Sequence, residues 1–434
     1  MTTAEVKLWG RTIGAVTWDP IRKIGVFQYS PDFIHSRIQL SPIMMPLSEM
    51  IYEFPNLSKE TFRGLPGLLS DSLPDKFGNL LINTWLSTQG RNISDFSPVE
   101  RLCYVGRRGM GALEFEPAIT QQRSGSQKIE VANLVNLSNL IINQRGELKG
   151  IFTDKDDKKS LEDILRVGTS AGGARAKAIL AWNPSTNEFQ SGQLPAKPGF
   201  EQWILKFDGI FNKKDKELSD PQGYGKIEYA YHLMAAECGI TMMPCRIYKE
   251  GGRCHFMTKR FDRTDDGQKN HMQSLCAITH ADFNEPAAFS YEETIITMKK
   301  MELSRTEIEQ LILRAMFNIV ARNQDDHVKN IAFLMNPDGN WSLSPAFDIS
   351  YSYDPQGYWT SQHQMVLNFK RDNFTLEDFI AFASIGGVKR NKTNEMLENV
   401  IMVVKKWDEF ATAAEVENEQ ITKIHNAHRL VFFN

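Results

Sequence analysis

Alternating apolar and polar positions predict strands in the first 260 or so residues of the chain. Residues 5–18 alternate around a glycine-bearing turn, which is typical of a β-hairpin. The same alternation predicts strands at residues 177–182 and 202–207. Two further strands are expected within residues 243–261, on either side of a Gly-Gly turn.

Apolar positions at helical spacing predict helices within residues 64–85, 130–165 and 226–238, and through most of the chain after residue 290. The polar stretch 119–130 is the candidate linker, with a domain boundary near residue 125. Near the C-terminus, apolar residues on one helix face predict core packing: Leu397, Val400, Ile401, Val404, Trp407, Ala411 and Ala414. A strand-rich part followed by a helix-rich part predicts an α+β fold with two lobes.

Composition narrows the classes of protein that fit. A chain of 434 residues with 41% apolar residues can fill two or three packed units, and its net charge of −3 argues against a surface built mainly to hold nucleic acid. The five cysteines are scattered without CxxC spacing, so neither a zinc knuckle nor a redox dithiol is predicted. Without a signal-peptide pattern or an apolar run of about 18 residues, we expect a cytoplasmic protein that does not contact a membrane.

The strongest chemical pattern is a D-x-x-x-x-N spacing, Asp325 to Asn330, followed by Asp348 in the segment PAFD. Phosphoryl transfer from ATP needs a carboxylate that orients the attacking hydroxyl and oxygen ligands for Mg²⁺. Residues 331–335 and 341–343 are expected to form two strands around a Pro-Asp-Gly turn. Such a hairpin would bring its two ends, and therefore these three groups, together.

Each of these groups also has an ordinary structural interpretation. Asp325, Asp326 and Asn330 could cap helices or stabilise turns, and the spacing alone favours neither interpretation. Lys206, set between large apolar residues on a strand, could meet ATP phosphates or simply face solvent. The loop 168–174, which contains Gly172 and Gly173, could hold an anion or form a plain turn.

Seven ordered segments resemble the HipA family of bacterial serine/threonine kinases, the toxin halves of toxin–antitoxin pairs. They are LPGLLSDSLPDKFG at 65–78, VGRRGMGALEFEP at 105–117, GTSAGGARAK at 168–177, WILKF at 203–207, KRFDR at 259–263, FNIVARNQDDHVKN at 317–330 and LSPAFDIS at 343–350. The resemblance spans nearly the whole chain and favours the catalytic interpretation over the structural one.

The resemblance implies a role for each matched residue. Asp325, rather than Asp326, matches the catalytic aspartate, and Asn330 and Asp348 match the metal ligands. Lys206 matches the lysine that contacts ATP phosphates. The backbone around Lys259 and Phe261 matches the segment that meets adenine, although Lys259 stands where the family has an acidic residue.

The glycine-rich loop is implied to bind the nucleotide through Ser170, Gly172 and Gly173. Ser170 falls where family members carry a regulatory phosphoserine, while the loop departs from the family pattern by reading GGARAK rather than GAQEK. By analogy with kinases, Glu228 is a candidate partner for Lys206, and an exposed carboxylate at a helix start is the alternative.

For the whole protein, the resemblance implies a protein-kinase-like fold with three parts: an N-terminal subdomain (1–125), the remainder of the N-lobe (126–262) and a helical C-lobe (263–434). It implies an enzyme that uses ATP and Mg²⁺ to phosphorylate a translation-linked protein, with an aminoacyl-tRNA synthetase as one candidate. A small helix-turn-helix antitoxin is the implied partner, and it would provide the contact with DNA indirectly. A phosphotransferase acting on a small molecule or on a DNA-associated protein is the alternative.

Overall fold

The computed structural model describes residues 2–119, 128–143, 164–165, 167–168, 175–193, 197–210 and 222–433. The chain divides into two compact units. The first contains Met1–Ile38, Leu47–Gly225 and Pro244–Met272, and the second contains Gln39–Pro46, Lys226–Met243 and Gln273–Asn434. The three-part division expected from the sequence stays a prediction.

An antiparallel five-stranded sheet in the first unit contains the predicted N-terminal hairpin. Its order is β4-β3-β2-β1-β5. The strands are β1 (Thr3–Leu8), β2 (Arg11–Asp19), β3 (Ile24–Tyr29), β4 (Ile51–Tyr52) and β5 (Leu113–Glu116). Trp9 and Gly10 both have positive φ and form the turn between β1 and β2, which confirms the hairpin.

The helices of the first unit are short, and most begin at a capping side chain. They are α1 (Pro31–Ile34), α2 (Lys59–Phe62), α3 (Gly67–Ser70), α4 (Lys76–Thr88), α5 (Pro98–Val105) and α6 (Val131–Asn143), with a 3₁₀ helix at Ile93–Asp95. Asp75 caps α4 by accepting a hydrogen bond of 2.8 Å from the main-chain N of Gly78. Ser97 and Glu100 form a capping box at the start of α5.

A second antiparallel sheet lies later in the same unit and has the order β7-β6-β8-β10-β9. Its strands are β6 (Lys177–Asn183), β7 (Glu188–Ser191), β8 (Glu201–Lys206), β9 (Cys245–Glu250) and β10 (Arg253–Lys259). Gly251 and Gly252, both with positive φ, form the turn between β9 and β10. The strands predicted at 177–182 and 202–207 and the Gly-Gly hairpin are therefore confirmed.

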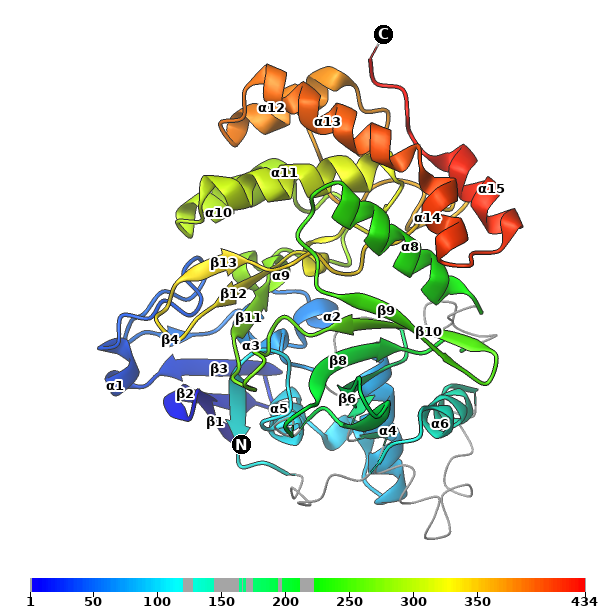
Figure 1. The fold of residues 1–434 in the computed structure, drawn as a ribbon. Coiled ribbons are helices and arrows are strands. Elements are labelled where there is room, and N and C mark those ends of the chain that lie inside the picture. The colour runs from blue at the N-terminus through cyan, green and yellow to red at the C-terminus, as the bar shows by residue number, and fades with distance from the viewer. Residues whose placement is uncertain are drawn as a thin grey trace. The chain divides into compact units, whose positions relative to one another are not determined.

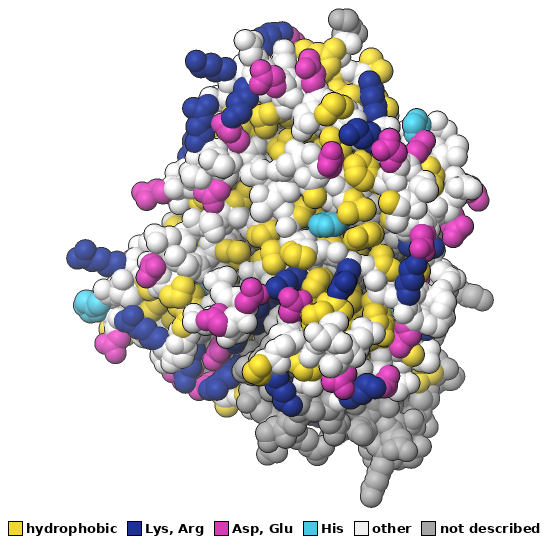
Figure 2. Space-filling model, viewed as in Figure 1, with side chains coloured by type: hydrophobic (Ala, Val, Ile, Leu, Met, Phe, Trp, Pro, Cys, Tyr) yellow, Lys and Arg dark blue, Asp and Glu magenta, His cyan; other side chains and the backbone are white. Residues whose placement is uncertain are grey.

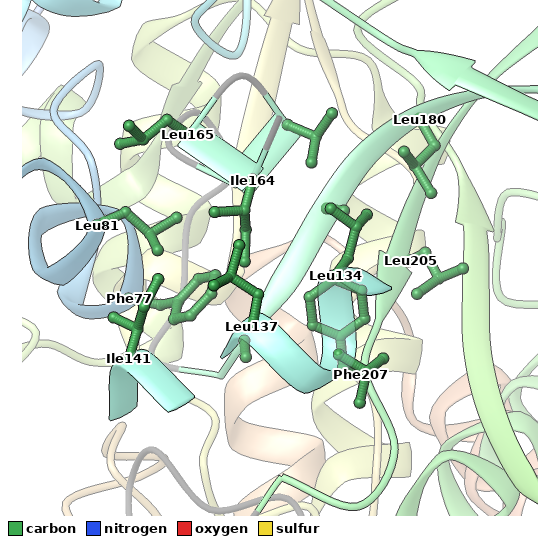
Figure 3. Close-up of a cluster of buried hydrophobic side chains, with 14 of the residues drawn as sticks. Phe77, Leu81, Leu134, Leu137, Ile141, Ile164, Leu165, Leu180, Leu205 and Phe207 are labelled. Atoms are coloured by element: carbon green, nitrogen blue, oxygen red, sulfur yellow. The ribbon is translucent and has the colours of Figure 1, made fainter. Parts of the chain in front are cut away.

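Helices α4 and α6 cover one face of this second sheet (Figure 3). Phe77 of α4 and Leu134 of α6 belong to one buried cluster with Leu180 of β6 and Leu205 of β8. Because successive strand residues point to opposite faces, Lys206 lies on the face away from this cluster. The core therefore fixes which side of the sheet carries the lysine.

The second unit is mainly helical (Figure 1). Its helices are α8 (Tyr224–Glu237), α9 (Leu275–Thr279), α10 (Tyr291–Lys300), α11 (Arg305–Val320), α12 (Leu376–Ile385), α13 (Arg390–Val404), α14 (Trp407–Ala413) and α15 (Asn418–Ala427). The strands β11 (His271–Ser274), β12 (Ala332–Met335) and β13 (Trp341–Leu343) form a small sheet in that order. Ser290 and Ser304 start α10 and α11 with capping boxes.

Helix α13 packs against both α11 and α12 (Figure 1). All seven residues of the apolar stripe predicted near the C-terminus are buried, so the stripe is core, as expected. The stripe is divided between α13 and α14 rather than carried by one continuous helix. The strand-rich first unit and the helical second unit confirm the predicted α+β class.

Lysine and arginine side chains are interspersed with aspartate and glutamate over the face drawn in Figure 2. This mixture agrees with the small net charge of −3. Among the described residues, no helix combines the length and the apolar character that crossing a membrane requires.

Candidate active site

Two loops of the second unit are tied to each other at both ends and carry the predicted catalytic and metal-binding residues. At one end, the main-chain N of Ser344 donates to Ala332 O (3.0 Å), which extends the pairing of β12 with β13. At the other end, Ser352 N donates to Arg322 O (3.1 Å). The hairpin expected between residues 331 and 343 is confirmed. Backbone hydrogen bonds therefore join the loops 323–331 and 345–351 to each other at both ends.

The carboxylate of Asp325 is hydrogen-bonded but remains partly exposed to solvent. Its side chain is 42% exposed. The indole Nε1 of Trp359 donates to Oδ1 at 2.6 Å, and His327 Nε2 lies 3.8 Å from the same oxygen. Neither contact involves the other oxygen, Oδ2, so the partly exposed carboxylate keeps an oxygen that can accept a hydrogen bond from a hydroxyl.

The side-chain amide of Asn330 is oriented by its own loop, residues 323–331, which is the candidate catalytic loop. Its Nδ2 donates to the main-chain O of Asp325 at 2.8 Å, which turns the amide so that Oδ1 remains as an acceptor. Asp348 is half-buried and has a φ of +53°, a left-handed conformation that is uncommon outside glycine. An amide oxygen and a carboxylate are hard oxygen donors of the kind that Mg²⁺ prefers, so the chemistry of these two side chains suits the metal.

Asp326 differs sharply from its neighbour Asp325 because it is buried. Its Oδ2 accepts hydrogen bonds of 2.8 Å from Tyr291 and from His363 Nδ1, and its Oδ1 accepts one of 2.7 Å from the main-chain N of Gln364. Burial alone would raise the pKa of Asp326, but His363 and these hydrogen bonds hold that pKa below its ordinary value. Asp326 is therefore a structural anchor, which supports the choice of Asp325 as the catalytic residue.

Lys206 ends β8 in the first unit, opposite Lys177 on β6 and Phe256 on β10. Its Nζ lies 5.6 Å from the centroid of the Phe256 ring, and the residue is half-buried. Lys177, in contrast, is buried, and its Nζ lies 3.9 Å from Asp75 Oδ2. Two lysines thus stand side by side on one sheet face, although the sequence pattern had singled out only Lys206.

The side chain of Lys259 is engaged by two carboxylates. Its Nζ lies 3.1 Å from Glu201 and 2.8 Å from Asp265, and its main-chain N donates to Pro244 O at 2.9 Å. Phe261, two residues later, is half-buried. The ammonium group that stands where the family has an acidic residue is thus paired with two carboxylates.

The segment KRFDR is built around the buried carboxylate of Asp262. Arg260 donates to both of its oxygens, at 2.8 and 2.7 Å, and Arg263 and the main-chain N of Gly111 donate to Oδ2 at 2.8 and 2.7 Å. Burial would raise the pKa of Asp262, but the two guanidinium groups hold it far below its ordinary value. This cluster joins the family-like segments 105–117 and 259–263.

Replacing Gly111 with alanine should destabilise the first unit by about 1–3 kcal/mol. Gly111 has a φ of +72°, and an added Cβ would lie 2.9 Å from the main-chain N of Met272. The loss would appear as a lower midpoint of denaturant unfolding. Gly10→Ala is the matched control, because Gly10 has a similar φ of +78° but no atom within 4 Å of the added Cβ. Equal losses for the two variants would contradict the steric part of this argument.

Three of the predicted nucleotide-binding residues, Ser170, Gly172 and Gly173, lie outside the described residues. Glu228 lies on α8 and is only 3% exposed, so the alternative that it is an exposed carboxylate is wrong. Its pairing with Lys206 stays a prediction. Two residues that contact the loop 323–331 were not predicted from the sequence. Trp359 lies 34 residues after Asp325 and His363 lies 37 residues after Asp326, and neither belongs to a recognisable motif.

Comparisons with known proteins identify the family. The profile described as the HipA-like C-terminal domain matches residues 169–407, and the one described as the HipA N-terminal domain matches residues 4–116. A comparison with curated protein sequences finds no match.

Among solved structures, the chain is similar to HipA of the Shewanella oneidensis MR-1 toxin–antitoxin system, which was solved with HipB and operator DNA. The TM-score is 0.66 at 17% identity, and the match covers 98% of this chain and 94% of that chain. The Helicobacter pylori proinflammatory kinase CtkA matches at a TM-score of 0.32 and 12% identity, over 59% of this chain and 92% of that chain, which is too low to carry an argument.

The likeness to HipA confirms the kinase-like two-lobe fold expected from the sequence. The chain belongs to the HipA family, because the HipA-like C-terminal profile alone matches more than half of the residues of the chain.

Proposed function

We propose that this protein is an ATP-dependent protein serine/threonine kinase. The observation that carries the proposal is the contrast between two adjacent aspartates on one loop. Asp326 is locked in a buried network, whereas Asp325 presents a partly exposed carboxylate next to the oriented amide of Asn330. One carboxylate thus fixes the loop and leaves the other to act on a substrate hydroxyl.

The residues take the following roles in the proposed reaction. Asp325 orients the acceptor hydroxyl and accepts its proton. Asn330 and Asp348 hold Mg²⁺, and Lys206 contacts the phosphates of ATP. Lys259 and Phe261 lie in the segment whose backbone meets adenine. Bound ATP supplies the phosphoryl group, and Mg²⁺ offsets the negative charge of its phosphates.

In the cell, we propose a cytoplasmic toxin that arrests growth by phosphorylating a translation-linked protein, with an aminoacyl-tRNA synthetase as one candidate. A small helix-turn-helix antitoxin would neutralise it and bring it to DNA. Ser170 remains the proposed site of an inactivating autophosphorylation. Gly172 and Gly173 belong to the same loop, which we propose binds the nucleotide. Incubating purified protein with labelled ATP and bacterial lysate tests the core of the proposal. Label in proteins supports it, while label only in small molecules would favour the alternative phosphotransferase.

Removing either metal ligand should weaken the binding of nucleotide in Mg²⁺ but not in EDTA. We expect Asn330→Ala and Asp348→Ala each to lose most of the gain in nucleotide affinity that Mg²⁺ provides. Mg²⁺ is bound by few protein oxygens, so the loss of one ligand weakens its binding strongly. Titration with a fluorescent ATP analogue measures this difference. Asp338→Ala is the matched control, since Asp338 is an exposed carboxylate at the far turn of the same hairpin. An unchanged Mg²⁺ dependence in both ligand variants would show that the metal site lies elsewhere.

A further inference from the structure

Arg314 is a buried arginine in the second unit, and no charged group among the described residues pairs with it. It lies on α11, is only 6% exposed, and donates from Nη2 to the main-chain O of Ser344 at 2.7 Å. Burial lowers the pKa of its guanidinium group to about 9, so the group stays charged at neutral pH. A buried charge without a counter-ion is unfavourable for folding, so stability alone does not explain an arginine at this position.

The hydrogen bond of Arg314 holds the start of the segment that carries Asp348. Ser344 is fully buried, and its main-chain N is already bonded to the end of β12. Two residues later, the main-chain N of Ala346 donates at 2.8 Å to the O of Thr241, which follows α8. Helix α11 thus supplies a third contact to a segment that is also bonded to β12 and to the chain after α8.

Arg314 belongs to a polar stripe on α11, whose members are spaced three or four residues apart and therefore share one face of the helix. The stripe consists of Glu307, Gln310, Arg314 and Asn318. Glu307 Oε1 accepts a hydrogen bond of 2.8 Å from the main-chain N of Leu343, the residue before Ser344. Gln310 Oε1 accepts one of 2.9 Å from the main-chain N of Thr241. Three side chains of the stripe therefore hold the backbone that leads into the Asp348 segment.

The last residue of the stripe holds the candidate catalytic loop. Asn318 accepts two hydrogen bonds of 2.9 Å from Asn323, one from main chain to main chain and one from side chain to side chain. Asn323 lies two residues before Asp325. Because an α-helix rises 1.5 Å per residue, Arg314 and Asn318 are about 6 Å apart along the axis of α11. One helix therefore binds the segments of Asp325 and Asp348 at a fixed spacing.

The chemistry of the guanidinium group suits this task. A charged donor forms a stronger hydrogen bond than a neutral one, and the planar group donates in a fixed direction. We propose that Arg314 is a positioning residue for Asp348: its hydrogen bond to Ser344 O fixes the segment 344–348 so that Asp348 shares a Mg²⁺ ion with Asn330. The inference rests on the proposed function and gives Arg314 a role that acts through the backbone rather than by contact with the metal.

The test measures how the binding of a fluorescent ATP analogue to the full-length protein depends on the Mg²⁺ concentration. Wild type and Arg314→Met are compared at a temperature at which thermal melting shows that both are folded. We expect the Mg²⁺ concentration that gives half of the gain in nucleotide affinity to rise roughly tenfold in Arg314→Met, while the affinity in EDTA stays unchanged. A purely structural role would lower the melting temperature and leave this Mg²⁺ concentration as it is in the wild type.

Two further variants complete the test. Arg314→Lys keeps the charge but not the planar donor group, so the half-saturating Mg²⁺ concentration should rise by less, roughly threefold. Arg305→Met is the matched control, because Arg305 is an exposed arginine in the first turn of the same helix, and it should leave that concentration unchanged.

A folded Arg314→Met protein with the half-saturating Mg²⁺ concentration of the wild type would overturn the inference and leave the proposed function intact. Should Arg314→Met not fold, Arg314→Lys decides: a threefold rise supports the inference, and a value equal to that of the wild type overturns it. A wild type whose nucleotide affinity does not respond to Mg²⁺ would contradict the proposed metal site itself, and the inference with it.

Discussion

Replacing Asp325 with asparagine should lower phosphoryl transfer by a factor on the order of 10²–10⁴ while the protein stays folded. Asparagine cannot accept the hydroxyl proton as a carboxylate does. It can still accept the hydrogen bond that Trp359 Nε1 donates to Oδ1 at 2.6 Å, and the side chain is 42% exposed, so its packing contributes little. The expected loss therefore lies in the chemical step rather than in stability.

Autophosphorylation and lysate phosphorylation measure the rate, and thermal melting measures the stability. Trp359→Phe is an informative companion, because it removes the donor to Asp325 but keeps an aromatic ring next to His327. We expect a partial loss of kcat in that variant. An Asp325→Asn protein that melts like the wild type and retains its full rate would exclude Asp325 as the residue that accepts the hydroxyl proton.

Local patterns were sufficient to predict the hairpin beside the candidate site, whereas the roles of the site residues came from the resemblance to the HipA family. The strand pattern on either side of residues 337–339 predicted the hairpin, and the backbone bond from Ser344 to Ala332 agrees with it. The roles of two adjacent aspartates could not be derived from their order, because burial is decided by distant residues. Tyr291 and His363 enclose Asp326 from 35 residues before it and 37 residues after it.

The anchoring of the catalytic loop by the C-terminal segment was also outside the reach of sequence patterns. Arg429 Nη1 lies 2.9 Å from His363 Nε2, and its main-chain N donates to Val320 O at 2.9 Å. No spacing rule connects residue 429 with residue 320. Once Arg429 donates to Nε2, His363 must carry its proton on Nδ1, and this N–H group can donate to Asp326. The tail thus takes part in fixing the catalytic loop.

Replacing Asp326 with alanine should destabilise the protein by about 3–5 kcal/mol, because it leaves buried donors without their acceptor. Three donors converge on this carboxylate, from Tyr291, His363 and the main chain of Gln364. Denaturant unfolding measures the loss as a difference in the free energy of unfolding at pH 7. Asp338→Ala, which removes an exposed carboxylate from the β12–β13 turn, should change that free energy by far less.

The pH dependence distinguishes this network from simple loss of packing. The folded-state pKa of Asp326 lies below its ordinary value of 3.8. A carboxylate with a depressed pKa contributes stability that is fully present above its unfolded-state pKa and is lost as the pH falls through its folded-state pKa. The gap in unfolding free energy between wild type and Asp326→Ala should therefore be constant near neutral pH and shrink once the pH falls below about 4. A gap that stays constant down to the lowest pH at which the wild type remains folded would mean that the charge of Asp326 contributes nothing to the stability of this loop.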